Sequence, residues 1–172
     1  MGVSDGLSQV CIPSIYQDEL GAVWLGTTEG LNRYNGKDVK VFQPSESNHG
    51  LTNNEINELC GDKNGRMYIR SGNDLIKLDI YTEQFTCLRQ KGVYGLFCKK
   101  DTLWVSCADG IYYYTGQGTE LTFFARVQKG FVGRALYVDK ETVWVVTRKY
   151  LVAISREDPP VSYTHLTLPT TS

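Results

Sequence analysis

Residues 21–35 read GAVWLGTTEGLNRYN, and this stretch decides the fold. A turn glycine precedes a short apolar run at residues 23–25, a second glycine-bearing turn follows at 27–30, and a second short run ends at the Asn-Gly pair 35–36. Short apolar runs joined by such turns are typical of antiparallel hairpins, and Asn-Gly is among the strongest hairpin signals. The stretch therefore predicts a pair of strands.

The same pattern returns three more times, in residues 65–79, 101–115 and 141–154. Each copy has an aromatic residue at the place of Trp24, called the anchor residue below, and an apolar residue seven positions later. The anchor residues are Trp24, Tyr68, Trp104 and Trp144, and the apolar residues are Leu31, Leu75, Ile111 and Leu151. Successive anchors are 44, 36 and 40 residues apart. A period of about 40–50 residues with paired strands in each unit is typical of propeller blades. We expect the anchors to pack in the core between blades.

Each repeat also opens with a glycine and an apolar residue, as in Gly6-Leu7, and adds a further apolar run after the hairpin, as at residues 39–42. Four short strands per unit form a propeller blade, and no apolar pattern keeps a helical period beyond about two turns. We predict an all-β chain in which residues 1–160 form a partial β-propeller with four-stranded antiparallel blades. The predicted blades are residues 6–49, 50–91, 92–129 and 130–160.

Polar turns precede the anchors. The first two repeats use Asp-x-x-Gly at residues 18–21 and 62–65, which suits a type I turn because Asp caps nearby amides and Gly accepts positive φ. The third and fourth repeats have shorter polar turns at Lys100-Asp101 and Lys140-Glu141. The carboxylates of these turns are expected to be solvated: Asp18, Glu19, Asp139 and Glu141.

The composition is that of a globular protein, with 41% hydrophobic and 22% charged residues. A net charge of −1 gives no electrostatic footprint for nucleic acid, so no nucleic-acid partner is expected. No apolar stretch approaches the roughly 18 residues of a spanning helix, and the first residues lack the basic and apolar regions of a signal peptide.

Little of the sequence suggests catalysis or cofactor binding. The two histidines, His49 and His165, are too few for a catalytic triad or a histidine-rich metal site. A calcium loop beginning at Asp62 would need Gly and Glu where the chain has Met67 and Asn73. No dinucleotide-binding or phosphate-binding loop is visible. We predict no catalytic residue, no metal site and no cofactor.

Five cysteines without a C-x-x-C pair are poor evidence for a disulfide framework or a zinc site. Cys60 and Cys98 precede their anchors by eight and six residues. We interpret these as matching places in the repeat, where a free cysteine acts as a small apolar core residue.

The end of the chain, residues 161–172, reads VSYTHLTLPTTS and has no similarity to the repeat. It looks like an in-frame translation of a transposase adapter used in preparing sequencing libraries, so we predict a non-native segment after about residue 160. A disordered natural tail is the alternative.

Residues 6–34 resemble the two-component-regulator propeller repeat, with its Gly-Leu-Ser opening, Asp-x-x-Gly turn, Val-Trp-Leu-Gly-Thr strand and Gly-Leu-Asn-Arg-Tyr closing. The later repeats keep fewer of these residues. The resemblance implies a piece of the periplasmic part of a hybrid two-component sensor histidine kinase, in which the predicted blades are an open arc of a seven-bladed ring. It also implies an oligosaccharide ligand, control of glycan-utilisation genes, and partners in further propeller blades and a second protomer.

Loops on a rigid scaffold commonly carry function, so ligand contacts are expected in the turns between the paired strands. The candidate residues in these turns are Thr28, Glu29, Asn73, Asp74 and Asp109. Tyr113 is a further candidate, because neighbours in a strand point opposite ways and the run of three tyrosines at 112–114 must place at least one ring off the core face, where it could stack on a sugar. Two readings stay open: a ligand-sensing module, and a scaffold for protein–protein contact or dimerisation without a small ligand. A propeller glycosidase or lyase is disfavoured, because the repeat positions supply no convergent carboxylates.

Overall fold

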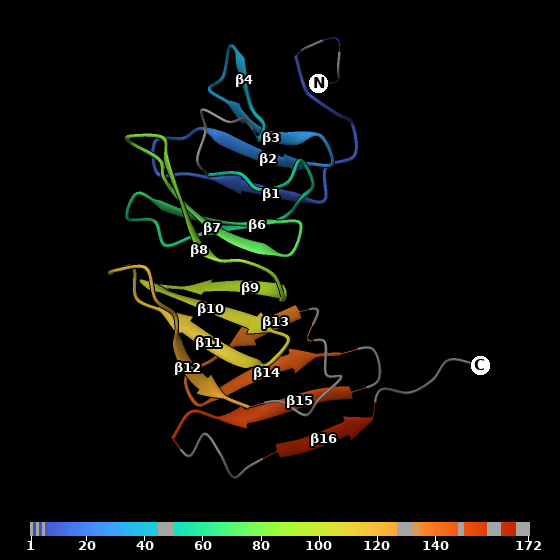
Figure 1. The fold of residues 1–172 in the computed structure, drawn as a ribbon, viewed down its shortest axis with the longest axis vertical. Helices are drawn as coiled ribbons and strands as arrows, with labels where there is room; N and C mark the ends of the chain where they lie inside the picture. Colours follow the sequence, from blue (N-terminus) through green and yellow to red (C-terminus); the bar gives the residue numbers. More distant parts are fainter. Residues whose placement is uncertain are drawn as a thin grey trace, which may run out of the picture. The chain divides into compact units, whose positions relative to one another are not determined.

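The protein is described by a computed structural model covering residues 2, 4, 6–44, 50–126, 133, 135–147, 150–157 and 163–167. The described residues form sixteen strands and no α-helix, and the strands make four separate four-stranded antiparallel sheets. Within each sheet, strands adjacent in the chain are paired. The predicted all-β fold with four-stranded propeller blades is thus confirmed (Figure 1).

The first sheet contains β1 (Ser14–Gln17), β2 (Val23–Thr27), β3 (Gly30–Tyr34) and β4 (Val39–Phe42). The second contains β5 (Ile56–Gly61), β6 (Arg66–Ser71), β7 (Asp74–Asp79) and β8 (Gln84–Arg89). The third contains β9 (Val93–Lys99), β10 (Thr102–Cys107), β11 (Gly110–Tyr114) and β12 (Thr122–Ala125). The fourth contains β13 (Ala135–Val138), β14 (Thr142–Val146), β15 (Tyr150–Ser155) and β16 (Tyr163–Thr167).

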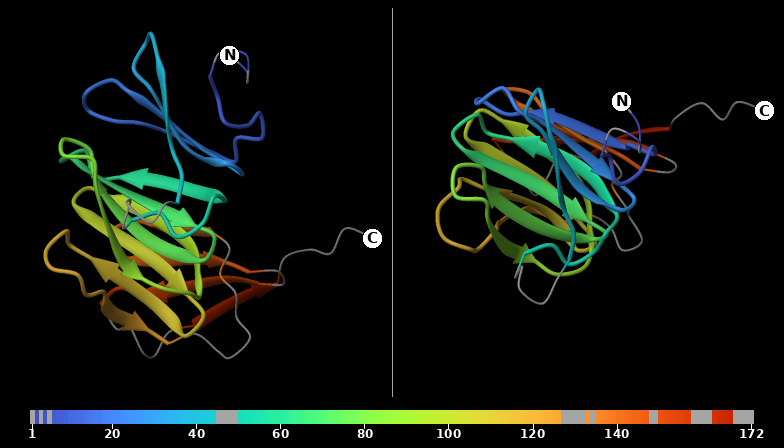
Figure 2. Two further views of the ribbon diagram at one scale, coloured as in Figure 1. Left: turned by 45° about the horizontal axis from the view of Figure 1, so that its top comes forward. Right: turned by 90° about the horizontal axis from the view of Figure 1, so that it is seen from above.

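The chain divides into two compact units, Met1–Lys91 and Gly92–Ser172, each with two sheets. In the first unit β5 lies beside β1 and β2, and in the second unit β13 lies beside β9 and β10 (Figures 1 and 2). Neighbouring sheets in each unit therefore adjoin through their first two strands. The open seven-bladed arc and the exact blade boundaries stay predictions. His49 and residues 130–132, the predicted opening of the fourth blade, lie outside the described residues.

All four repeats share one register, including the divergent fourth. The anchors occupy the second strand of each sheet, and the residue two positions after each anchor pairs with the apolar residue of the third strand. These pairs are Gly26 with Leu31, Arg70 with Leu75, Ser106 with Ile111, and Val146 with Leu151. In the first three sheets this spacing encloses a two-residue hairpin turn, since β2, β6 and β10 end three positions before β3, β7 and β11 begin.

Each unit has an apolar core between its two sheets. Trp24 is fully buried in a cluster with Ile56, Met67 and Ile80 of the second sheet, and Trp104 packs with Val143 and other residues of the fourth. Burial of about 150–250 Å² for such a ring contributes roughly 4–6 kcal/mol at about 25 cal/mol per Å². Trp24 and Trp104 are thus the anchors that join the two sheets of each unit.

Two turn carboxylates bond to their anchor rings, whereas solvated groups were expected: Asp18 is buried and Asp139 is partly exposed. Asp18 is 4% exposed: its Oδ2 accepts a 2.7 Å hydrogen bond from Trp24 Nε1, and its Oδ1 accepts from the amides of Leu20 and Ala22. Asp139 does the same for Trp144, at 2.9 Å. The aspartate caps its own turn and then satisfies the indole N–H, which would otherwise be buried without a partner. Glu19 and Glu141 are exposed, as expected.

The segment predicted as a non-native or disordered tail contains β16, which pairs with β15 and completes the fourth sheet. Without it β15 would present an unpaired row of backbone groups, and threonine-rich segments suit extended pairing. The fourth sheet therefore extends past residue 160. That this segment comes from outside the natural protein stays a prediction.

The interpretation of Cys60 and Cys98 as matching positions is wrong. Cys60 lies opposite Tyr68 across the sheet, whereas Cys98 lies opposite Leu103, and it is Phe97 that faces Trp104. The third repeat has a shorter turn, so counting back from the anchor shifts the alignment by one residue, which reverses the face of a strand. All five cysteines are free thiols.

Candidate functional site

A concave site in the second unit lies over the anchor Trp104, where residues of the third sheet meet Arg156, which directly follows β15. It consists of two hollows of about 490 and 360 Å³ that share Thr102, Trp104 and Arg156. We call their combination the Trp104 groove. Its size falls within the range of about 300–1,000 Å³ typical of small-ligand sites.

One part of the Trp104 groove is aromatic and is lined by Tyr113, Phe123 and Phe124. Tyr113 lies directly across the sheet from Trp104, and their ring centroids are 5.6 Å apart. Phe124 packs edge-on against Trp104 at 5.0 Å. Tyr113 and Phe124 are half-buried and Phe123 is exposed, so this part offers ring surface to a ligand.

The other part is cationic. It is lined by Lys99, Lys100, Asp101, Lys140 and Arg156, together with the shared residues. Two tight hairpin turns bring these side chains together: Lys100 has a φ of 51°, which allows β9 and β10 to reverse in two residues, and Asp139 closes the turn before β14. Both turns were expected to be merely polar.

Hydrogen bonds hold this cationic part in place. Arg156 Nη1 donates to the carbonyls of Asp139 and Lys140, at 3.1 Å each, and its Cζ lies 5.4 Å from the Trp104 ring centroid. Lys99 Nζ donates to the carbonyl of Val138 at 2.7 Å. The hydrogen bonds from Trp144 and from the turn amides, aided by the nearby Lys99 charge, hold the pKa of Asp139 below its ordinary value.

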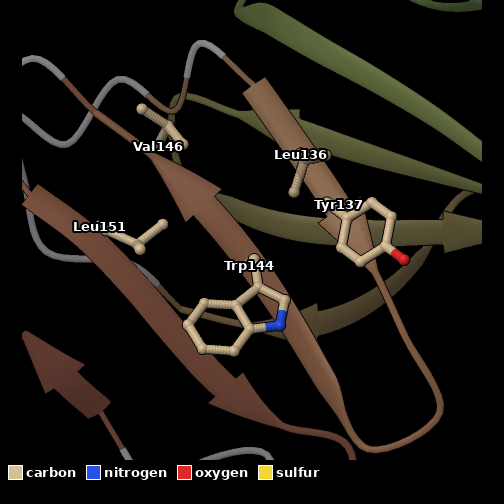
Figure 3. Close-up of a pocket in the computed structure, with 5 residues that line it drawn as sticks. All are labelled: Leu136, Tyr137, Trp144, Val146 and Leu151. Carbon is tan, nitrogen blue, oxygen red and sulfur yellow. The ribbon is translucent and has the colours of Figure 1, made fainter.

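A third hollow, of about 400 Å³, lies on the fourth sheet and is apolar (Figure 3). Its side chains come from three neighbouring strands: Leu136, Tyr137, Trp144, Val146 and Leu151. Trp144 is only half-buried, unlike Trp24, and Tyr137 is 57% exposed. The expectation that every anchor is covered by a following blade is therefore not met for Trp144 among the described residues.

The structure separates most of the predicted ligand-contact residues from these hollows. Thr28 and Glu29 form the turn after β2, Asn73 lies in the turn after β6, and Asp74 is the first residue of β7. These two turns come together, because Gly30 and Gly72 donate to the neighbouring carbonyls of Asn54 and Glu55. Asp109 lies in the turn after β10 and accepts a 2.8 Å hydrogen bond from Tyr112. Only Tyr113 lines the Trp104 groove. The ligand role of all six residues stays a prediction.

The sequence pattern did not predict that the basic residues of the groove would form part of a site. The available signal was the loss of Asp-x-x-Gly in the third repeat, where a lysine pair takes its place.

Among the described residues no cluster of histidine, cysteine or carboxylate side chains could hold a metal ion. The described part of the chain also contains no helix long and apolar enough to cross a membrane.

Comparison with known proteins supports the resemblance noted in the sequence. Residues 6–29 match the model of the two component regulator propeller family. A stretch of 39 residues is 44% identical to histidine kinase P4 of Formosa agariphila. That stretch is 23% of this chain and 3% of the kinase. The chain thus carries a two component regulator propeller repeat and spans a small part of the relative it matches.

The fold is shared with several solved structures. The extracellular domain of the hybrid two component system BT3049 from B. thetaiotaomicron superimposes with a TM-score of 0.82 over 97% of this chain and 26% of its own, at 22% identity. The corresponding domain of BT4673 gives 0.73 over 97% of this chain and 23% of its own, at 21% identity. Virginiamycin B lyase from Staphylococcus aureus gives 0.69 over 93% and 56%, at 12% identity. The last is an enzyme, so the fold alone does not decide between sensing and catalysis.

Proposed function

We propose that this chain is a ligand-sensing propeller module of a hybrid two-component sensor histidine kinase, that it acts in the periplasm, and that it recognises an oligosaccharide whose presence controls glycan-utilisation genes. The family match in residues 6–29 and the fold shared with extracellular domains of hybrid two component systems support the sensor assignment. The observation that carries the ligand assignment is the Trp104 groove, in which partly exposed aromatic rings adjoin charged and hydroxyl groups.

This combination suits a sugar. The axial C–H groups of a pyranose ring form an apolar face that packs on aromatic rings such as Tyr113, while its hydroxyls need directed polar partners such as Thr102 and Arg156. The groove also lies where two blades meet. A ligand that touched both would stabilise one relative arrangement of the blades, which is how a binding module can bias the next part of a sensor.

Isothermal titration calorimetry of the 172-residue chain against a panel of neutral and acidic oligosaccharides tests this assignment. We expect saturable binding of at least one member, and loss of that binding in Tyr113→Ala. Urea unfolding of the variant, compared with the parent chain, checks that the fold is kept. Heat from no sugar in the panel would overturn the ligand assignment.

The second candidate function is a scaffold for protein–protein contact or dimerisation, and the observation that favours it is the apolar hollow around Trp144. Sedimentation equilibrium discriminates between the two functions. A stable dimer in a chain that binds no oligosaccharide is the expected result for a scaffold.

A further inference from the structure

The cationic part of the Trp104 groove concentrates charge in a chain that is almost neutral overall. Four cations and one carboxylate line it, a net formal charge of +3, whereas the whole chain has a net charge of −1. The other nearby carboxylate, that of Asp139, faces Trp144 and its own turn amides. Glu141 is exposed and does not line the hollow. Among the described residues, no ion pair neutralises Lys100, Lys140 or Arg156.

The guanidinium of Arg156 is positioned to receive an anion. Both of its described hydrogen bonds use Nη1, and the ring of Trp104 supports the guanidinium group from one side. Within the described residues Nε and Nη2 have no partner. A guanidinium held in this way loses little conformational entropy when it binds, and its planar donors match a carboxylate or a sulfate.

The first unit shows that the fold does not require this charge. The residue equivalent to Arg156 is Ile80, since each directly follows the third strand of its sheet and donates its amide to the turn before the second strand. Ile80 is 3% exposed and joins the Trp24 core, so that junction is closed by an apolar side chain. The cation over Trp24 is Arg33, which is paired with Glu83 at 3.1 Å. The first unit also has a turn lysine at its junction, Lys63, which lies over the ring of Tyr16 and donates to the carbonyl of Gln17. The second unit instead gathers four cations around one hollow.

We propose that the ligand of the Trp104 groove is an acidic oligosaccharide, with a carboxylate or sulfate bound by Arg156 together with Lys100 and Lys140. Its sugar ring would then lie along the aromatic part, against Tyr113 and Phe123. This inference rests on the proposed function, because it names the class of oligosaccharide that the same site takes. An acidic peptide would satisfy the cations but would make little use of the aromatic part.

Calorimetric titrations of the 172-residue chain at low ionic strength test the proposal with four probes. These are trigalacturonate, a sulfated chondroitin disaccharide, neutral maltotriose and inorganic sulfate. A fifth titration uses a tetraglutamate peptide. We expect one of the two acidic sugars to bind at least about tenfold more tightly than maltotriose, and its affinity to fall as NaCl rises from about 50 to about 300 mM. The chondroitin disaccharide carries a uronate carboxylate as well as its sulfate. Binding of trigalacturonate therefore shows that a carboxylate is enough, whereas binding of the chondroitin disaccharide alone shows that the sulfate is needed.

Charge-removing variants identify the site. Arg156→Gln and Lys140→Gln should each weaken acidic-sugar binding by about tenfold or more, because each removes a charge-assisted contact. Lys37→Gln is the matched control: it removes an equally exposed lysine from the turn after β3, in the first unit, and should change the affinity less than twofold. Thermal melts of all three variants check that the fold is kept.

The failures of the two proposals are distinguishable. Binding of maltotriose with an affinity equal to that of the acidic sugars, unaffected by Arg156→Gln, would overturn the acidic class while keeping an oligosaccharide ligand. Binding of inorganic sulfate or tetraglutamate as tight as that of the acidic sugars would show a general anion site and overturn the proposal as well. Heat from no sugar at all would overturn the proposed function itself.

Discussion

Replacing Asp18 by asparagine tests whether the turn aspartate stabilises the blade through the anchor ring. In the structure Asp18 Oδ2 accepts a hydrogen bond from Trp24 Nε1, and both residues are buried. Asparagine keeps one oxygen for the turn amides of Leu20 and Ala22 but places an NH₂ group against the indole N–H. The indole then has no acceptor, and a buried polar group without a partner costs about 1–3 kcal/mol.

The size of the effect can be assigned to this contact by a double-mutant cycle. Trp24→Phe removes the N–H group and most of its need for an acceptor, although it also leaves a cavity. Asp18→Asn should therefore lower the free energy of unfolding by roughly 2 kcal/mol in the parent chain but by less than about 1 kcal/mol beside Trp24→Phe. The expected coupling between the two positions is about 1–2 kcal/mol.

Urea unfolding followed by circular dichroism measures all four chains of the cycle. Asp38→Asn serves as the control, because Asp38 is exposed in the turn after β3 and its substitution should change the free energy of unfolding by less than about 0.5 kcal/mol. A coupling energy near zero would refute the reasoning. It would mean that Asp18 acts only as a turn cap and that the anchor is held by packing alone.

Three further perturbations follow from the same architecture. Hydrogen bonds hold the pKa of Asp139 below its ordinary value of 3.8. The contribution of this carboxylate to the free energy of unfolding is therefore complete above pH 3.8 and is lost as the pH falls through the lower pKa of the folded state. Trp144→Phe should raise this pKa toward 3.8, as measured by NMR titration of the carboxyl carbon. Gly26→Ala should destabilise the chain by about 1–3 kcal/mol in urea unfolding, since a Cβ at Gly26 would lie 2.8 Å from Ile56 Cγ2 of the adjoining sheet; unchanged stability would contradict this packing. Val146→Lys should reduce self-association of the chain in sedimentation velocity by charging the apolar hollow of the fourth sheet, and a parent chain that is already monomeric at high concentration would argue against an interacting face.

The fold could be predicted from sequence because its determinants are local. A hairpin such as 23–34 is specified by apolar runs and glycine turns within about a dozen residues, and copying it four times identifies the blade. Even the fourth repeat, which keeps little besides Trp144, has the same register, since Val146 pairs with Leu151 as Gly26 pairs with Leu31. Strand β16 escaped prediction because its pairing depends on the free edge of β15, and its own sequence carries no repeat signal.

The candidate site was less predictable because it is made by contacts between repeats. Arg156 lies over the ring of Trp104, which is 52 positions earlier in the chain, and no sequence pattern near either residue predicts this contact. Tyr113 is predicted as a ligand contact only because three consecutive tyrosines cannot all face the core. In the structure Tyr114 is buried, while Tyr112 and Tyr113 are half-buried. Turn carboxylates were misjudged for a related reason, since the partner of Asp18 is the side chain of Trp24 and not its own backbone alone.

The third repeat lacks the turn aspartate, and this difference accompanies the change at the junction between the third and fourth sheets. Where the aspartate is kept, as at Asp18, the turn folds onto its anchor, and Ile80 of the adjoining blade closes the junction. In the third repeat the Asp-x-x-Gly turn is replaced by Lys100 and Asp101, and the adjoining blade contributes Arg156 instead of an apolar residue. Both junctions therefore have an apolar core, but only the second carries, among the described hollows, an aromatic and cationic groove beside it. A departure from the repeat pattern on both sides of that junction is what the proposed ligand site would require, because the charged residues there replace a local turn cap and an apolar side chain.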